Sequence, residues 1–244
     1  IDFDLAEEQL LLESSVREWG AREVAPRIRE LDRQHRLDPS VLPQMAKMGL
    51  LGCAVPEAYG GAGMDYISLG IISEELEYVD TSLRVIMSVH AGLNCLTLLT
   101  WGSEDQKQRY LVPQAQGTRI ATYGLTEPSA GSDVRGIQTV AVKRGDRYLL
   151  TGEKMWISLA DVADNFLVFA WTDLEKKKQR DTSGLSAFIV ERSFKGFSSG
   201  TLKEKWGILA GNTGFFKMED VEVPAANGGG RPGEGFKIAM FALD

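Results

Sequence analysis

The spacing of apolar residues divides the chain into a helical first part and a β-rich second part. Up to about residue 118, apolar positions recur every three to four residues, as they do along one face of an α-helix. Beyond this point, short apolar runs with alternating positions are typical of strands. The change of period predicts an α+β fold, in which an N-terminal α-helical bundle domain (residues 1–118) is followed by an antiparallel β-barrel domain (residues 119–230).

Helix caps and breakers locate the helices of the first part. Asp4 and Glu7 have the spacing of a capping box at the start of the first helix, and Pro26 is expected to bend or break that helix. Asp65 is expected to cap a later long helix. Over residues 82–100, apolar side chains occur on almost all sides, which predicts a central helix of the bundle.

Turn residues separate the strands of the second part, and Gly145 with Asp146 indicates a hairpin. The charged run over residues 175–181 is expected to be a solvated loop, with contact to ligand phosphates as the alternative. Many short strands with short turns favour a compact barrel or sandwich. The strands are predicted at about 120–125, 138–143, 147–151, 154–157, 165–172, 185–191, 201–206 and 213–223.

The last part of the sequence combines a glycine-rich loop with an apolar segment. Residues 228–233 match G-x-G-x-x-G by letter, but no βαβ pattern surrounds them and Pro232 lies inside the loop, so a Rossmann site is rejected. A helix is expected to begin near Glu234 or Gly235. Because so short and apolar a helix would not be stable alone, residues 231–244 are predicted to be the start of a truncated C-terminal helical domain.

Composition and charge narrow the class of protein. The net charge of −7 argues against a nucleic-acid partner, because phosphate binding needs a basic footprint. No apolar run reaches the roughly 18 residues of a membrane span, and the acidic start Ile1–Asp4 is not a secretory signal. Cys53 and Cys95 are expected to be buried thiols of a reducing compartment. Neither His35 nor His90 has a metal-ligand spacing, so no metal site is predicted.

The stretch from Tyr123 to Asp133 (YGLTEPSAGSD) carries the first candidate binding residues. It continues an apolar strand and then becomes a turn rich in Pro, Ser and Gly. The small residues around Gly131 would let a ligand approach main-chain N–H groups, and Thr126 and Ser132 supply hydroxyls. An ordinary strand-to-loop turn explains this composition equally well.

A second stretch, GEKMWIS at residues 152–158, follows the next predicted hairpin strand. Trp156 could lay its indole face on a flat ring, and Ser158 would point to the same side of an extended chain. A core Trp in a β-sheet is the alternative interpretation.

Together the two stretches resemble the signatures T-E-P-x-x-G-S-D and G-x-K-x-W-I-T/S of the acyl-CoA dehydrogenase family, and the resemblance extends over essentially the whole chain. It implies a helical domain, a middle β-barrel and a C-terminal four-helix domain, with FAD between the barrel and the C-terminal helices of a homotetramer. It also implies α,β-dehydrogenation of a short, medium or branched acyl-CoA thioester to the trans-2-enoyl-CoA, with electrons passed to an electron-transfer flavoprotein. Such a protein is expected in the cytoplasm of a bacterium or the mitochondrial matrix of a eukaryote.

The resemblance also implies where the cofactor is bound. Leu125 and Thr126 are expected at the flavin edge, Gly131 and Ser132 near the FAD pyrophosphate, and Trp156 on the flavin face away from the substrate. The Ser158 hydroxyl should reach the flavin N5. The predicted cofactor-binding residues are Tyr123, Leu125, Thr126, Gly131, Ser132, Trp156, Ile157 and Ser158.

The residues for substrate binding and catalysis are fewer. The family's catalytic Glu is expected after Asp244, so no base is named within the chain. Asp80 is the only acid in the chain expected near the acyl pocket, and capping of the following helix is its favoured role. Ser132, Thr81 and Arg84 are expected to bind substrate. Arg84 stands where glutaryl-CoA dehydrogenases place an Arg that pairs with the substrate carboxylate, although a structural salt bridge is the favoured interpretation.

Two departures from the family pattern leave alternatives open. Leu209 stands where relatives commonly carry Arg, and the triple Gly at residues 228–230 is unusual. The alternative functions are a glutaryl-CoA dehydrogenase-like oxidation with decarboxylation, an acyl-CoA oxidase, and a non-catalytic acyl-CoA or protein-binding module if the chain ends at Asp244.

Overall fold

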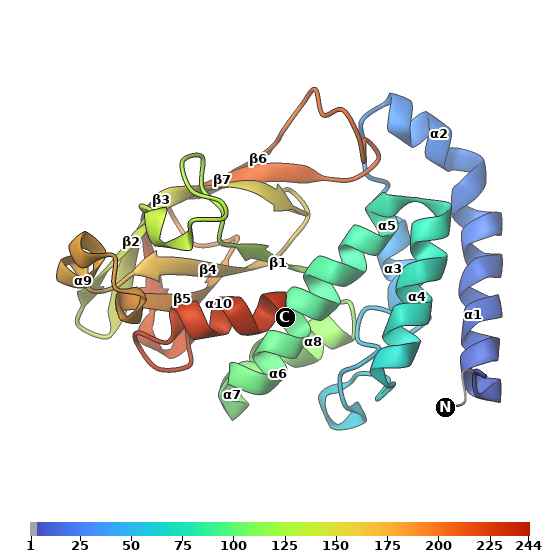
Figure 1. Ribbon diagram of the computed structural model, residues 1–244, viewed down its shortest axis with the longest axis horizontal. Helices are drawn as coiled ribbons and strands as arrows, with labels where there is room; N and C mark the ends of the chain where they lie inside the picture. Colours follow the sequence, from blue (N-terminus) through green and yellow to red (C-terminus); the bar gives the residue numbers. More distant parts are fainter. Residues whose placement is uncertain (1–3) are drawn as a thin grey trace.

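A computed structural model of the protein describes residues 4–244. Residues 1–3 of the acidic start Ile1–Asp4 lie outside the described residues. Helices fill one side of the molecule and a curled β-sheet fills the other, with the last helix, α10 (Gly235–Leu243), lying between them (Figure 1). The α+β architecture predicted from the sequence is therefore confirmed.

The first helical segment differs in detail from its prediction. Helix α1 (Glu7–Trp19) begins after Ala6, whose N–H donates to the Gln9 side chain, so Asp4 is not its cap. A π-helical turn, η1 (Gly20–Val24), then leads into α2 (Ala25–Arg33). Pro26 lies in the first turn of α2, where a missing N–H costs nothing, and the direction of the chain changes at this point (Figure 1).

Among the remaining helices of the first part, one begins at the cap predicted for it. Asp65 Oδ1 accepts a hydrogen bond of 2.7 Å from the Ser68 N–H at the start of α4 (Tyr66–Val79). Ser103 and Gln106 form the capping box of α7 (Glu104–Gln106). The other elements are α3 (Val41–Lys47), η2 (Glu57–Tyr59), α5 (Thr81–Ile86), η3 (Met87–Leu96), α6 (Thr97–Trp101), η4 (Lys107–Leu111) and α8 (Val112–Ala115).

Segments α5, η3 and α6 form one helix, Thr81–Trp101, at the centre of the molecule. By length and composition this helix could cross a membrane, although no apolar run of that length was expected. Half of its most apolar window is buried inside the structure. Ile86 and Met87 belong to the same buried cluster as Phe166 and Val168 of the sheet. These contacts are those of a core helix shared by the helical part and the sheet.

The sheet has eight strands in the order β6-β7-β3-β2-β4-β5-β8, and β1 pairs with β4 outside this path. Most neighbours are antiparallel, but β1–β4 and β2–β4 are parallel pairs, which departs from the antiparallel barrel that was predicted. Within the described residues the two end strands, β6 and β8, do not pair with each other. The strands are β1 (Ala121–Gly124), β2 (Val140–Arg144), β3 (Arg147–Ser158), β4 (Asn165–Trp171), β5 (Leu185–Glu191), β6 (Phe197–Thr201), β7 (Thr213–Pro224) and β8 (Gly228–Gly229).

Three predictions for the second part of the chain need correction. The two strands predicted at 147–151 and 154–157 are one strand, β3, interrupted by irregularities in its pairing with β7. The strand predicted at 201–206 is wrong, because β6 ends at Thr201 and the chain then enters a loop. The charged run at 175–181 is mostly the exposed helix α9 (Leu174–Gln179), capped by Asp173, rather than a loop. Shorter turns of 3-10 helix are η5 (Val134–Gly136), η6 (Thr182–Gly184) and η7 (Ala225–Asn227).

His90 joins the central helix to the sheet. Its Nδ1 accepts from the Ala121 N–H at 3.0 Å, so its Nε2 carries the proton and donates to the Gln114 carbonyl at 3.0 Å. The ring is fully buried, and this burial lowers the pKa of His90 to about 4. His90 is therefore a neutral structural residue. No group of three or more metal-binding side chains occurs in the part of the chain that the structure describes, and Cys53 and Cys95 are buried free thiols, as expected.

Candidate functional site

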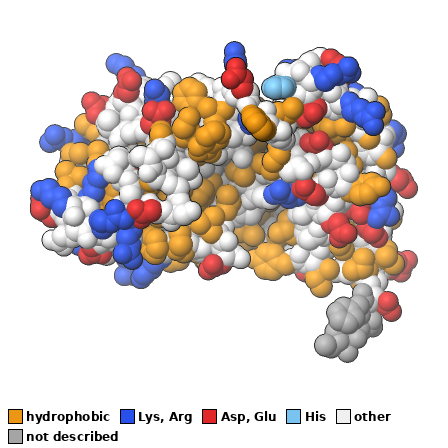
Figure 2. Space-filling view, turned by 45° about the horizontal axis from the view of Figure 1, so that its top comes forward, with side chains coloured by type: hydrophobic (Ala, Val, Ile, Leu, Met, Phe, Trp, Pro, Cys, Tyr) orange, Lys and Arg blue, Asp and Glu red, His pale blue; other side chains and the backbone are white. Residues whose placement is uncertain are grey.

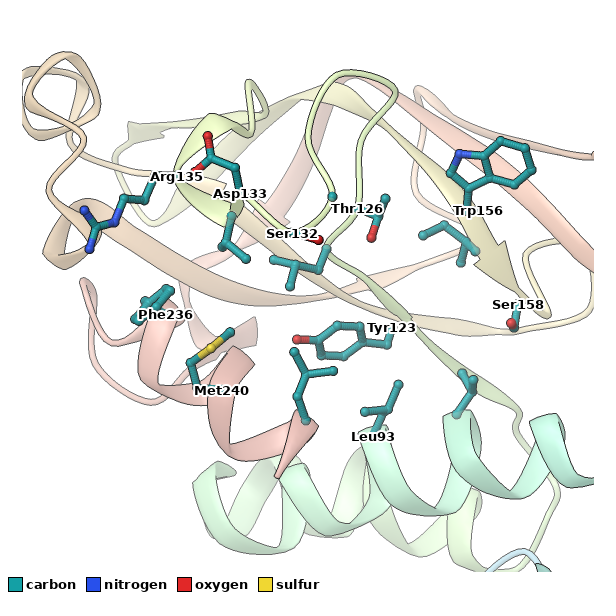
Figure 3. A pocket seen from close by; sticks show the side chains of 16 residues that line it. Leu93, Tyr123, Thr126, Ser132, Asp133, Arg135, Trp156, Ser158, Phe236 and Met240 are labelled. Carbon is teal, nitrogen blue, oxygen red and sulfur yellow. The ribbon is translucent and has the colours of Figure 1, made fainter.

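A cavity of about 530 Å³ opens between the central helix, the sheet and α10. Hydrophobic side chains gather around the hollow in the middle of the face shown in Figure 2. The turn after β1 lies above the cavity and Leu93 of the central helix lies below it (Figure 3). Residues from four separate parts of the sequence thus share one pocket.

All eight residues predicted to bind the cofactor line this pocket. Those from the first motif are Tyr123, Leu125, Thr126, Gly131 and Ser132, and those from the second are Trp156, Ile157 and Ser158. The two motifs therefore face one common space, as the family resemblance requires of them.

The turn of the first motif is closed by its own backbone. The N–H groups of Glu127 and Ala130 each donate to the other residue's carbonyl, at 2.9 and 3.1 Å. This pairing places Gly131 and Ser132 at the edge of the pocket. A side chain added at Gly131 would meet no protein atom within 4 Å, so the fold itself does not require a glycine there.

Three hydroxyls at the pocket are free to bind a ligand. Thr126, Ser132 and Ser158 line the cavity, and within residues 4–244 none of their hydroxyls takes part in a hydrogen bond. The Ser158 backbone is held separately, because Thr122 Oγ1 donates to its carbonyl.

Trp156 is a surface residue of the pocket rather than a core Trp. Its side chain is 60% exposed, and its φ of 63° lies in the left-handed region where residues with side chains are uncommon. The pairing of β3 with β7 shifts between Met155 and Ile157, so Trp156 sits at a bulge. The bulge turns the indole outward at the mouth of the pocket (Figure 3).

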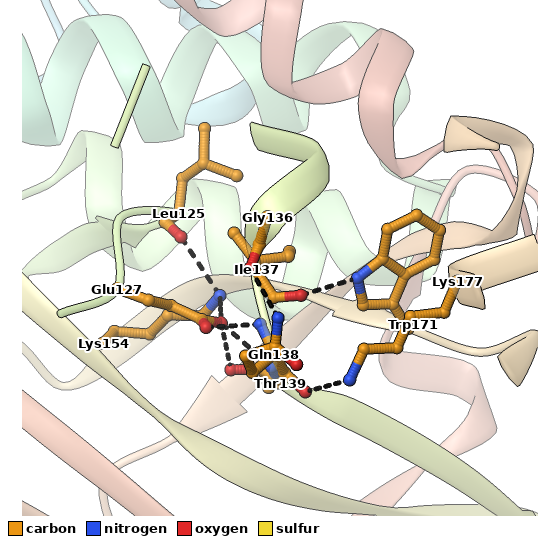
Figure 4. A network of polar contacts seen from close by, with 9 residues as sticks. All are labelled: Leu125, Glu127, Gly136, Ile137, Gln138, Thr139, Lys154, Trp171 and Lys177. Carbon is orange, nitrogen blue, oxygen red and sulfur yellow. Dashed lines mark hydrogen bonds and ion pairs between the residues drawn. The ribbon is translucent and has the colours of Figure 1, made fainter. Parts of the chain in front are cut away.

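A buried ion pair connects the two motifs. Lys154 Nζ lies 2.9 Å from Glu127 Oε1, and the two side chains are 0% and 3% exposed (Figure 4). Although burial alone would raise the pKa of Glu127, the charge of Lys154 and hydrogen bonds from Thr139 and Gln138 hold it below its usual value. The carboxylate therefore stays ionised. Sequence reasoning missed this pair, although both residues are fixed letters of the two motif signatures.

The three residues proposed near the acyl end of the substrate lie outside the lining of this pocket. Asp80 Oδ1 accepts from the Ser82 N–H at 2.9 Å, which is the capping role that was favoured. Glu77 accepts hydrogen bonds from the other two residues. Thr81 Oγ1 donates to Glu77 at 2.6 Å, and Arg84 Nε donates to Glu77 at 2.8 Å. The favoured salt-bridge interpretation of Arg84 is thus the one seen.

Several pocket residues were not predicted. Asp133 is the last letter of the first motif, and Val134 and Arg135 follow directly after it, so the motif and its continuation were the available signal. The others are apolar residues of helices: Val89, Leu93, Phe236, Met240 and Leu243. Their apolar pattern indicated only burial, because which helix faces the sheet is a tertiary property.

The fold and the pocket define a class of α+β proteins in which a helical layer and a β-sheet enclose an apolar ligand site. Residues 6–118 match the family model "Acyl-CoA dehydrogenase, N-terminal domain", and residues 122–221 match "Acyl-CoA dehydrogenase, middle domain". The chain belongs to the acyl-CoA dehydrogenase family, which confirms the resemblance seen in the motifs.

Individual relatives agree. The short-chain specific acyl-CoA dehydrogenase of Clostridium acetobutylicum is 44% identical over 244 residues, which are 100% of this chain and 63% of the relative. Butyryl-CoA dehydrogenase from Megasphaera elsdenii superposes with a TM-score of 0.94 at 36% identity, over 100% of this chain and 63% of that one. A chain from a structure described as the electron transferring flavoprotein of Acidaminococcus fermentans superposes with a TM-score of 0.95 at 40% identity, over 100% of this chain and 63% of that one. Acyl-CoA dehydrogenase complexed with FAD from Bacillus anthracis superposes with a TM-score of 0.89 at 35% identity, over 98% of this chain and 40% of that one. The chain spans less than two thirds of the length of these relatives.

Proposed function

We propose that the protein takes part in FAD-dependent α,β-dehydrogenation of a short-chain acyl-CoA thioester. The observation that carries this proposal is the convergence of both family motifs on one pocket that has free hydroxyls and an exposed indole. The similarity to short-chain and butyryl-CoA dehydrogenases supports a short acyl group. Electron-transfer flavoprotein as acceptor, a homotetramer, and a cytoplasmic or mitochondrial matrix location are proposed on the same basis.

The residues present fit a flavin. A planar ring needs a flat apolar wall and polar groups at its edge, and Trp156 offers the former while Thr126 and Ser158 offer free hydroxyls. The open space at Gly131 beside Ser132 suits the approach of a pyrophosphate to the backbone. When bound, FAD would supply the two-electron acceptor that no amino-acid side chain provides.

The protein's own side chains would bind, orient and desolvate the substrate. Leu93, Phe236 and Met240 form an apolar wall opposite the motif residues (Figure 3). Such a wall excludes water from an acyl chain, which strengthens hydrogen bonds to the thioester carbonyl. A hydrogen-bonded carbonyl makes the neighbouring α-proton easier to remove.

The described lining of the pocket holds no suitable base for that proton. Among the described residues, Asp133 is the only carboxylate that lines it, and Arg180 Nη2 pairs with Asp133 at 2.6 Å. Asp80 is occupied as a helix cap. We therefore keep the proposal that the catalytic Glu belongs to a segment after Asp244.

A flavin titration tests the proposed function. The purified protein, reconstituted with FAD without oxygen and containing the segment proposed to carry the catalytic Glu, should show a flavin spectrum that bleaches with butyryl-CoA and less with longer chains. Turnover with electron-transfer flavoprotein as acceptor should follow, and hydrogen peroxide in air would indicate an oxidase instead. Binding of butyryl-CoA with no bleaching would favour the non-catalytic module, and absence of any FAD binding would refute the proposal.

The glutaryl-CoA alternative has its own test in Arg84. Because Arg84 already pairs with Glu77 and Ser88, we expect Arg84→Leu to leave the ratio of glutaryl-CoA to butyryl-CoA turnover unchanged. The lost exposed ion pair should cost only about 1 kcal/mol or less of unfolding free energy. A selective loss of glutaryl-CoA turnover, measured side by side with both substrates, would restore the alternative.

A further inference from the structure

The Glu127–Lys154 pair is poorly explained by stability alone. Both side chains are almost completely buried, at 3% and 0% exposure. Removing two charges from water costs about as much as their attraction returns, so a buried ion pair adds little net stability over apolar residues of the same size. The contacts of the pair show what else it can do.

Lys154 also binds a main-chain atom of the pocket wall. Its Nζ donates to the Leu125 carbonyl at 3.1 Å. No cis peptide occurs in the described chain, and in a trans peptide the C=O and the following N–H point in opposite directions. Holding the Leu125 carbonyl toward Lys154 therefore turns the Thr126 N–H away from Lys154. Leu125 and Thr126 line the cavity, whereas Lys154 is not among its lining residues. That N–H donates to no residue within 4–244.

Glu127 fixes the ammonium from the other side. Glu127 Oε1 accepts from the Thr139 N–H at 3.0 Å and from the Thr139 hydroxyl, and Oε2 accepts from the Gln138 N–H. The Thr139 carbonyl in turn accepts from the backbone N–H of Trp171 in β4 at 2.9 Å. The Lys154 ammonium is thus tied to the centre of the sheet (Figure 4).

We propose that Lys154, anchored by Glu127, is a positioning residue that sets the Leu125–Thr126 peptide and aims the Thr126 N–H at the edge of the bound flavin ring. Only the identity of the ligand rests on the proposed function. The orientation of the peptide is a property of the chain itself.

A crystal structure of the Lys154→Met variant, determined without added ligand, tests the orientation directly. Met keeps the length and apolar stem of Lys and removes its donors, so the Leu125–Thr126 peptide should rotate. Lys217→Met is the matched control, because Lys217 is 49% exposed on the neighbouring strand and lies 3.6 Å from Glu153. An unchanged peptide in Lys154→Met would overturn the proposal, whether or not the protein binds FAD.

Cofactor properties provide the second readout. A misdirected N–H should weaken FAD binding about tenfold, the effect of roughly one lost hydrogen bond. If the reduced ring loses about tenfold more affinity than the oxidised ring, the two-electron potential falls by about 30 mV. Fluorescence titration and spectroelectrochemistry measure both, and Lys217→Met should match the unmodified protein.

A double variant separates positioning from folding. Lys154→Met alone leaves Glu127 as an unpaired buried charge, so its thermal midpoint should fall. Adding Glu127→Gln removes that charge and should recover part of the lost thermal midpoint. FAD binding should stay about tenfold weaker than in the unmodified protein. Recovery of both properties together would show a purely structural pair and refute the proposal. Failure of the unmodified protein to bind FAD would refute the proposed function only, since the crystal structures still decide the peptide orientation.

Discussion

At the scale of single residues, Gly124 and Gly131 of the first motif stretch are glycine for different physical reasons. Gly124 ends β1, where an added Cβ would lie 2.5 Å from the Phe216 ring. Gly131 borders the pocket, where an added Cβ would contact nothing. The first glycine is required by packing, and the second is available for a ligand.

This contrast predicts opposite effects of one substitution. Gly131→Ala should leave the free energy of unfolding within about 0.5 kcal/mol of its original value and weaken FAD binding, because the methyl group occupies the space of the ligand. Gly124→Ala should cost about 1–3 kcal/mol through overpacking against Phe216. Urea unfolding and FAD titration of both variants check this, and equal FAD affinity of Gly131→Ala would argue against a ligand at that position.

At the scale of elements, one buried ring connects β1 to two helical segments, in addition to the parallel pairing of β1 with β4. His90 on η3 accepts from the Ala121 N–H at the start of β1 and donates to the Gln114 carbonyl of α8. The neutral ring of His90 therefore connects three segments, η3, β1 and α8. Burial disfavours the protonated ring, and a protonated ring could not accept from Ala121.

His90 predicts a pH dependence of stability. Burial lowers the pKa of His90 from 6.5 to about 4, so between these values the unfolded chain takes up a proton that the folded protein does not. The stability contribution is complete above pH 6.5, falls as the pH drops toward 4, and amounts to about 3 kcal/mol.

Urea unfolding of the unmodified protein and of His90→Gln at several pH values from 7 to 4.5 measures this effect. The variant should be less stable at pH 7 and show a flatter acid dependence. His35→Asn is the control, because His35 is exposed and should retain the original slope. An unchanged slope in His90→Gln would assign the acid sensitivity to other groups.

At the scale of the whole molecule, the pocket exists only where the helical part, the sheet and α10 meet. Tyr123 of β1 donates from its hydroxyl to the Ala239 carbonyl of α10 at 3.1 Å. Ile238 and Ala239 share a buried cluster with Tyr123 and Phe169. These contacts hold the last helix against the sheet and keep the pocket wall in place.

Tyr123→Phe should therefore loosen α10. Loss of this hydrogen bond is expected to lower the free energy of unfolding by about 1 kcal/mol and to speed hydrogen exchange of the α10 amides. Tyr148→Phe is the matched control, because both tyrosines are 8% exposed but no described residue binds the Tyr148 hydroxyl. Equal effects of the two substitutions on α10 exchange would contradict this role.

Short-range signals explain how much could be predicted. Caps at Asp65 and Asp80, the hairpin at Gly145 and the start of α10 all depend on neighbouring residues, and the structure has them where they were expected. The eight motif residues of the pocket were also predicted, because the two motifs resemble signatures of a family whose members share one fold.

The sequence by itself determined the kinds of elements, their order and the family, since periodicity and capping act within a few residues. Only the tertiary structure decided which partners meet: Arg84 with Glu77, Lys154 with Glu127 across 27 positions, and Trp156 at the surface rather than in the core. Such pairings are set when distant segments close around a common core, and no local pattern records which faces will meet.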